Sequence, residues 1–228
     1  MKRLLPLLAI LLAGIMTMRA QTLYQPHFHV GAHAGAVLSQ QSFNPSIEQK
    51  FNQGITMGVS AMWAEERHVG LRAELNLTQR GWKEDFSETP QFSYSHTLTY
   101  VELPIMTHIF FGGRHVKGFF NLGPQLCYMV GDKVDANFNV NDIPGIDGFP
   151  TINRTTEQMS MEVTNRFDYG ICAGAGMELI IKRKHSITLE GRYYYGLGNI
   201  FPSAKKDYFN ASRGNAIMVT LGYMFRLK

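Results

Sequence analysis

The feature that most constrains this chain is an alternation of apolar and polar residues with a period of two. Between Phe167 and Lys182 the odd positions are apolar, whereas the even positions are mainly glycine and charged residues. Successive side chains of a β-strand point to opposite faces, so this stretch predicts a strand with one apolar and one polar face. The same pattern recurs in residues 28–38, 54–63, 68–80, 97–111, 117–130, 185–197 and 215–227. The sequence therefore predicts an all-β chain with eight long strands.

The connections between these segments are alternately short and long. Short turns lie near 64–67, 112–116 and 182–185, and long connections lie near 39–52, 81–96, 131–166 and 198–214. Short turns at one end and long loops at the other are typical of barrels in a bacterial outer membrane. We therefore predict an eight-stranded antiparallel up-and-down transmembrane β-barrel over residues 21–228.

The first twenty residues have the pattern of a secretory signal peptide. Lys2 and Arg3 precede an uncharged, mostly apolar run that ends at Met18 and is too short to span a bilayer comfortably. We expect cleavage after Ala20, which leaves 19 basic and 18 acidic side chains and gives no reason to expect nucleic-acid binding. No later stretch is apolar for the roughly 18 residues that a membrane helix needs, so any membrane segments must be strands.

The alternation alone does not say which face lies outside, because a soluble carrier of the lipocalin type alternates as well. Three observations favour lipid on the apolar side. Glycine is frequent on the polar face and suits the crowded interior of a narrow barrel. That face also carries charges of both signs, which can neutralise one another in a lumen. Aromatic residues mark the ends of apolar faces, as interfacial girdles do, at Phe28, Trp63, Phe111, Tyr128, Phe167 and Tyr195.

Eight charged residues share the polar parity, and we expect them to form an interior polar network. They are Arg72, Glu74, Glu102, Asp168, Glu178, Glu190, Arg192 and Arg226. A lumen of eight strands is about wide enough for its own side chains, so these charges are predicted to fill it as a closed, structural plug. A proton relay or acid–base chemistry by Glu102, Glu178 and Glu190 is the alternative interpretation.

Two sets of residues have the composition of chemical sites but lack the remaining groups that such sites need. His27, His29 and His33 share a strand face, yet no cysteine or carboxylate motif accompanies them, so we predict polar filling and no metal. The adjacent pairs Ser95–His96 and His185–Ser186 have no visible third partner for a hydrolase. We therefore predict no catalytic residue, no cofactor and no enzymatic activity.

Two further features are left open by the sequence. Cys127 and Cys172 have inward parity on consecutive strands, so they are either free thiols or a disulfide, depending on strand register. The 131–166 connection contains aspartate, glycine and proline, and it is either a mobile outer loop or a binding site for a partner or cation.

Several runs of the sequence resemble one known family. They are Glu74–Trp82 (ELNLTQRGW), Tyr100–Met106 (YVELPIM), Gly123–Tyr128 (GPQLCY), Phe167–Leu179 (FDYGICAGAGMEL), Leu189–Ile200 (LEGRYYYGLGNI) and Arg213–Phe225. Together they are similar to the PorT-like outer-membrane β-barrel family of Bacteroidetes, over nearly all of the chain after residue 20. The resemblance implies an eight-stranded barrel in the outer membrane, and its founding member is tied to a protein-secretion system.

These observations predict a protein of the outer membrane of a Gram-negative bacterium, with a structural or interaction role in the cell envelope. Its expected partners are outer-membrane lipid, the assembly machinery during insertion, which Tyr223 and Phe225 could serve, and other envelope proteins. A small-solute channel, a lipid-modifying barrel enzyme and a soluble ligand carrier are the alternatives.

Overall fold

The computed structural model describes residues 26–64, 68–150, 154–204 and 207–227. The expected signal peptide and its cleavage point lie outside these residues. The described elements are β1 (His27–Asn44), β2 (Gln49–Lys50), β3 (Asn52–Ala64), β4 (Val69–Glu84), β5 (Tyr94–Gly112), β6 (Val116–Ala136), η1 (Ile143–Gly145), α2 (Glu157–Ser160), β7 (Phe167–Ile181), β8 (His185–Gly196) and β9 (Ala211–Arg226).

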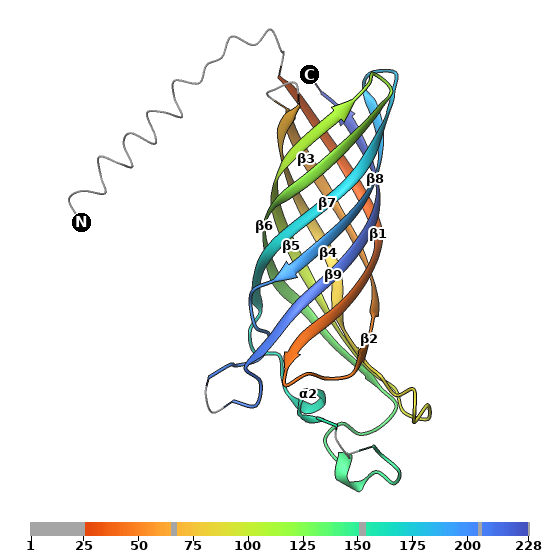
Figure 1. Ribbon diagram of the computed structural model, residues 1–228, viewed down its shortest axis with the longest axis vertical. Helices are drawn as coiled ribbons and strands as arrows, with labels where there is room; N and C mark the ends of the chain where they lie inside the picture. The colour runs from red at the N-terminus through yellow and green to blue at the C-terminus, as the bar shows by residue number, and fades with distance from the viewer. Residues whose placement is uncertain (1–25, 65–67, 151–153, 205–206, 228) are drawn as a thin grey trace, which may run out of the picture.

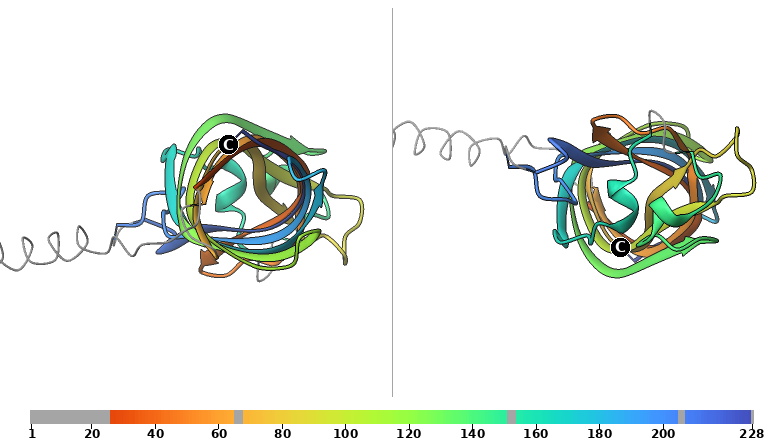
Figure 2. Two further views of the ribbon diagram at one scale, coloured as in Figure 1. Left: turned by 90° about the horizontal axis from the view of Figure 1, so that it is seen from above. Right: turned by 90° about the horizontal axis from the view of Figure 1, so that it is seen from below.

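Eight long strands form an antiparallel ring (Figures 1 and 2). Each long strand pairs with the next along the chain, and β9 pairs back with β1, so that the sheet has no free edge among them. The short β2 pairs with the end of β4 outside this ring. The predicted all-β, antiparallel up-and-down arrangement is confirmed. No helix in the described part of the chain has the length and apolar character needed to cross a bilayer.

Several strands continue further toward the long loops than the alternation predicts. β1 ends at Asn44 rather than near residue 38, and its last five residues still pair with β9. β6 likewise extends to Ala136 rather than to about residue 130. In β6 the register with β5 shifts by one residue between Thr99 and Tyr100, which breaks the period of two at Val130. In the β1 extension polar residues occupy both faces, since the outer face there meets water, and the contrast that reveals a strand in the sequence is lost. The two-residue β2 was not predicted for the same reason.

The apolar face of the ring lies outside and the polar face lies inside. Met177 and Leu221 on the outer surface are 60% and 62% exposed, whereas Glu74 and Glu102 in the lumen are only 2% and 1% exposed. Large exposed apolar residues cover the outside of all eight long strands, which is far more apolar surface than a water-soluble monomer presents. This arrangement is that of a barrel in lipid and excludes the soluble carrier with an apolar cavity.

Exposed aromatic side chains lie near both ends of this apolar belt. The register places Phe28 directly opposite Trp63 near the short turns, and Tyr128 opposite Phe167 toward the long loops. All four are exposed on the outer surface. Aromatic rings favour the depth of the lipid headgroups, so the two pairs mark the expected edges of the hydrocarbon layer.

Glycine on the inner face makes room for large lumen side chains. At Gly170 on β7, an added Cβ would lie 2.2 Å from the carbonyl oxygen of Tyr195 and 2.8 Å from the ring of Tyr194, a fully buried tyrosine on the neighbouring β8. Real Cβ atoms essentially never approach other atoms so closely. The glycine-rich polar face is therefore a packing requirement of a narrow bore.

Candidate functional site

The middle of the lumen contains a group of ion pairs that joins strands on opposite sides of the ring. Arg192 on β8 donates from its two terminal nitrogens to the two carboxylate oxygens of Glu74 on β4, at 2.7 and 2.9 Å. Arg72 contacts the same carboxylate at 2.7 Å. Glu190 accepts from Arg192 at 3.0 Å and forms an ion pair with Arg72 at 3.3 Å. All four side chains are buried. Ion pairs therefore span the lumen from β4 to β8, as expected if side chains plug the barrel.

A second group lies nearer the long loops, around Arg80. Its guanidinium contacts Glu102 at 2.9 Å and Asp168 at 3.4 Å, and it lies 4.3 Å from the ring centroids of both Tyr100 and Tyr194. The Tyr194 hydroxyl also donates to Asp168 at 2.9 Å. A planar cation between two rings and two carboxylates combines ion pairing with cation–π attraction.

The structure brings six of the eight predicted network residues into these two groups. Glu178 and Arg226 lie elsewhere, at the mouth formed by the short turns, because both come close to the end of their strands. Arg80 is the network residue that sequence reasoning missed. It has the same parity as Arg72 and Glu74 and is the last residue of the predicted 68–80 strand, so parity was a signal that could have found it.

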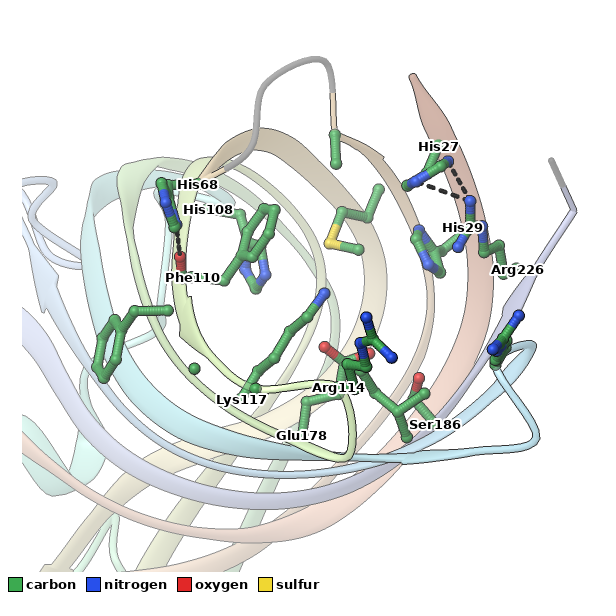
Figure 3. Close-up of a pocket in the computed structure, with 17 residues that line it drawn as sticks. His27, His29, His68, His108, Phe110, Arg114, Lys117, Glu178, Ser186 and Arg226 are labelled. Carbon is green, nitrogen blue, oxygen red and sulfur yellow. Dashed lines mark hydrogen bonds between the residues drawn. The ribbon is translucent and has the colours of Figure 1, made fainter. Parts of the chain in front are cut away.

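A pocket of about 590 Å³ opens at the short-turn mouth (Figure 3). It is lined by the ends of β1, β3, β5, β6, β7, β8 and β9 and by residues of three short turns. Four cationic and four histidine side chains line it, against a single described acid, Glu178. The basic residues are His27, His29, His68, His108, Arg114, Lys117, Arg183 and Arg226.

The opposite mouth is closed by part of the connection between β6 and β7. We call residues 137–150 and 154–166 the outer cap. Figure 2 shows α2 lying within the outline of the ring, and Gln158 and Met159 of this helix are fully buried. The Glu84 carboxylate at the end of β4 accepts from Arg154 at 3.1 Å and from Gln158 at 2.9 Å. Burial raises the pKa of the Glu84 carboxyl, although these two partners oppose the shift.

Aromatic packing holds the outer cap against the loops that follow β4. The rings of Phe86 and Phe92 contact those of Phe138 and Phe149 at centroid distances of 5.0 to 6.0 Å. The 131–166 connection is therefore partly strand and partly a packed cover across the mouth.

The serine–histidine pairs considered for hydrolysis are separated by the pleat of their strands. Ser186 is buried in the lumen, whereas His185 contacts the Tyr223 hydroxyl on the outer surface. His96 is buried and bonded to Asp132, and its neighbour Ser95 has the opposite parity. Adjacent residues of a strand face opposite sides, so neither pair can act together.

The three histidines of β1 lie on one face, but each has its own surroundings. His33 lies 3.6 Å from Glu74, and a terminal nitrogen of Arg226 lies 2.7 Å from Nε2 of His27. Within the described residues, no three His, Cys, Asp or Glu side chains are grouped as a metal site would require.

Cys127 and Cys172 are buried free thiols. The register pairs Cys172 with Gly123 and Cys127 with Asp168. The two cysteines are therefore offset by four residues along the paired strands, about 13 Å at the usual rise, which is too far for a disulfide.

Comparison with known proteins identifies the family to which this arrangement belongs. The family model for the outer membrane protein beta-barrel domain matches residues 20–202. The chain belongs to this family. As an outer membrane protein beta-barrel domain it is located in the outer membrane, which agrees with the lipid-facing surface described above. No curated protein matches the sequence.

This beta-barrel domain is similar to solved structures of other outer-membrane proteins. OprG from Pseudomonas aeruginosa is 6% identical, with a TM-score of 0.52 over 88% of this chain and 96% of that chain. Neisserial surface protein A is 15% identical, with a TM-score of 0.47 over 89% of this chain and 99% of that chain. The outer membrane protein W of E. coli is 12% identical, with a TM-score of 0.42 over 90% and 100%. At these identities the likeness to OprG shows the fold alone.

Proposed function

We propose that this protein is a non-conducting outer-membrane barrel with a structural or interaction role in the cell envelope. The observation that carries the proposal is the chain of buried ion pairs from Glu74 through Arg192 to Glu190, which crosses the lumen between β4 and β8. Side chains that are bonded across a narrow bore leave little space for ions or solutes to pass.

The surfaces that remain for contacts with other molecules are the lipid belt, the two mouths and the loops. Lipid covers the apolar belt, and the assembly machinery is the partner during insertion. The outer cap is the surface on which other envelope proteins would dock. We also propose that the protein is not an enzyme, because the pleat separates Ser186 from His185 and Ser95 from His96.

A finer assignment rests on sequence motifs. The runs YVELPIM, FDYGICAGAGMEL and LEGRYYYGLGNI resemble the PorT-like barrels of Bacteroidetes. On this basis we propose an origin in that phylum, export by a cleaved signal peptide over residues 1–20, and a contribution to protein secretion.

Conductance measurements test the closed lumen. The mature protein is refolded in detergent, checked by its faster migration on an unheated gel, and inserted into planar lipid bilayers. We expect current at the level of protein-free bilayers. Reproducible discrete steps from the wild-type protein would contradict the proposal and support a small-solute channel.

A gene deletion tests the link to secretion. Loss of the gene is expected to lower the amount of protein exported to the medium, and the wild-type gene is expected to restore it. Cross-linking from residues of the outer cap, followed by purification, identifies the partner. Unchanged export together with an absence of cross-linked envelope protein would contradict the interaction role.

A further inference from the structure

The pocket at the short-turn mouth carries positive charge that the carboxylates of the lumen do not neutralise. Arg114, Lys117 and Arg183 line it and, in the described part of the chain, none of them forms an ion pair. Figure 3 shows Arg114 from the β5–β6 turn and Lys117 from the start of β6 extending into the open mouth. Donors that converge from different elements favour a multivalent oxyanion, and guanidinium groups match phosphate geometry.

Two polar groups in the same pocket have open bonding positions. The Nδ1 atom of His29 is buried without a hydrogen-bond partner. Glu178 is only 6% exposed as a whole residue, lines the pocket, and has no cationic partner within 4.0 Å among the described residues. A carboxylate that faces a pocket without a partner offers a position for a bound cation or hydrogen-bond donor.

We propose that this pocket binds a phosphoethanolamine group, either as a free phosphate ester or as the headgroup of a surrounding phospholipid. The phosphate accepts from Arg114, Lys117 and His29, and the ammonium group donates to Glu178. A ligand with both charges explains why one unpaired acid lies among four cationic residues. A metal cation alone would be repelled by those four residues, and a simple anion would leave Glu178 without a partner.

The remaining lining suits the uncharged part of such a ligand. Met62, Phe110 and Ile180 supply apolar contacts, and the volume of about 590 Å³ is much larger than a phosphate ion needs. The Nζ atom of Lys117 lies 4.7 Å from the ring centroid of Phe110, which holds the ammonium group of the lysine over the pocket.

Calorimetric titration of the refolded protein in a maltoside detergent tests the soluble form of the ligand. The probes are phosphoethanolamine, glycerol 3-phosphate and ethanolamine. We expect phosphoethanolamine to bind most tightly, glycerol 3-phosphate more weakly, and ethanolamine not at all. Arg114→Gln combined with Lys117→Gln should weaken phosphoethanolamine binding at least about tenfold, because two charge-assisted contacts are lost.

The matched control removes the same charge from a neighbouring turn. Lys182 and Lys184 lie in the β7–β8 turn and do not line the pocket. Lys182→Gln combined with Lys184→Gln is expected to change the affinity less than about threefold, since only screened long-range attraction is altered. An equal loss in both double variants would overturn the proposal in favour of non-specific attraction to a basic rim.

Glu178→Gln tests the ammonium contact separately. This variant should bind phosphoethanolamine and glycerol 3-phosphate about equally, because it loses the carboxylate that prefers the ammonium group and keeps the phosphate donors. An unchanged preference for phosphoethanolamine would overturn the assignment of Glu178.

The lipid source is tested in nanodiscs that contain equal amounts of phosphatidylethanolamine and phosphatidylcholine. After transfer of the protein to detergent, native mass spectrometry measures the lipid that remains bound. Retention of phosphatidylethanolamine by the wild-type protein, lost in the Arg114/Lys117 double variant, identifies the headgroup as the ligand. Binding in the titration alone identifies the free ester. Absence of binding in both experiments would overturn the proposal.

Discussion

At the scale of single residues, Arg192 makes the largest contribution to joining the two sides of the lumen. It contacts both oxygens of Glu74 and one oxygen of Glu190, all within 3.0 Å. Arg192→Met leaves Arg72 as the only guanidinium for two buried carboxylates. Removing one partner of a buried ion pair costs about 3–5 kcal/mol, so we expect a loss of that size in the free energy of unfolding. Urea titration of the protein in lipid vesicles measures it.

The control for this variant is an ion pair outside the lumen. Lys133 lies 3.9 Å from Asp135, and both side chains are exposed. Lys133→Met should change the unfolding free energy by less than about 1 kcal/mol. If the two variants are equally stable, the ion pairs across the lumen do not hold the barrel together.

Residue parity predicted which charges point inward, but it did not predict their partners. Arg72, Glu74, Glu190 and Arg192 were expected in the lumen, and the structure joins them because the register sets β4 and β8 at matching heights. The height of a residue along the bore depends on register, which a single sequence does not give.

At the scale of elements, the outer cap depends on Glu84, which binds it to the end of β4. Glu84→Ala removes the acceptor of both Arg154 and Gln158 and leaves a partly buried guanidinium without its carboxylate. Hydrogen bonds to charged groups contribute about 1.5–3 kcal/mol, which corresponds to roughly tenfold or more in the population of the opened cap. Trypsin should therefore cleave after Arg154 about ten times faster, as followed by mass spectrometry of the folded protein.

Asp85 provides a control at the next position along the chain. Its carboxylate accepts from Ser87 and pairs with Lys50 at the surface, and neither of these partners belongs to the outer cap. Asp85→Ala should leave the cleavage rate after Arg154 within about twofold of wild type. Faster cleavage in Asp85→Ala than in Glu84→Ala would mean that surface contacts of Asp85, and not the buried contacts of Glu84, hold the outer cap in place.

Strand packing gives a second prediction at this scale. Gly170→Val places side-chain atoms against the Tyr195 carbonyl oxygen and the Tyr194 ring, so we expect a loss of at least about 1–3 kcal/mol in unfolding free energy. Ala173→Val on the same strand faces lipid and should be nearly neutral. Urea titration in vesicles compares the two, and equal stabilities would contradict a packing requirement for glycine at position 170.

The existence of the eight strands was predictable, whereas their outer ends were not. Alternation requires two unlike surroundings, and these exist only where lipid lies on one side and the lumen on the other. Beyond Leu38 on β1 and beyond Val130 on β6 the strands enter water, and hydrogen bonding rather than hydrophobicity continues the sheet. The folding of the outer cap likewise depends on aromatic contacts among segments far apart in the sequence.

At the scale of the whole molecule, the barrier to permeation is the mid-lumen network and not the outer cap. Replacing residues 139–163 with a short Gly–Ser linker removes the cover and leaves the contacts around Arg192 and Arg80 intact. We expect this variant to refold and to show no current above that of protein-free bilayers. Discrete steps that appear only after removal of the cap would place the barrier there instead.

The sequence predicted the membrane location and the apolar outer and polar inner faces of the barrel, because both follow from the alternation of residue types along each strand. It did not reveal the short-turn pocket, whose lining comes from seven strands and three turns. Arg114 and Lys117 lie at one connection and Arg183 lies at another, and only closure of the ring brings them to one opening. A site made of single residues from many strands has no local motif by which it could be recognised.

The length of β5 and β6 determines how far the outer cap lies above the membrane. β5 begins at Tyr94, seven residues before Val101, its outermost large exposed apolar residue. At about 3.3 Å per residue and the usual tilt, this segment raises the outer cap roughly 15–20 Å above the hydrocarbon layer. The barrel therefore holds the outer cap above the membrane surface. A receptor, sugar chain or neighbouring protein would contact the outer cap in the aqueous medium without entering the lipid.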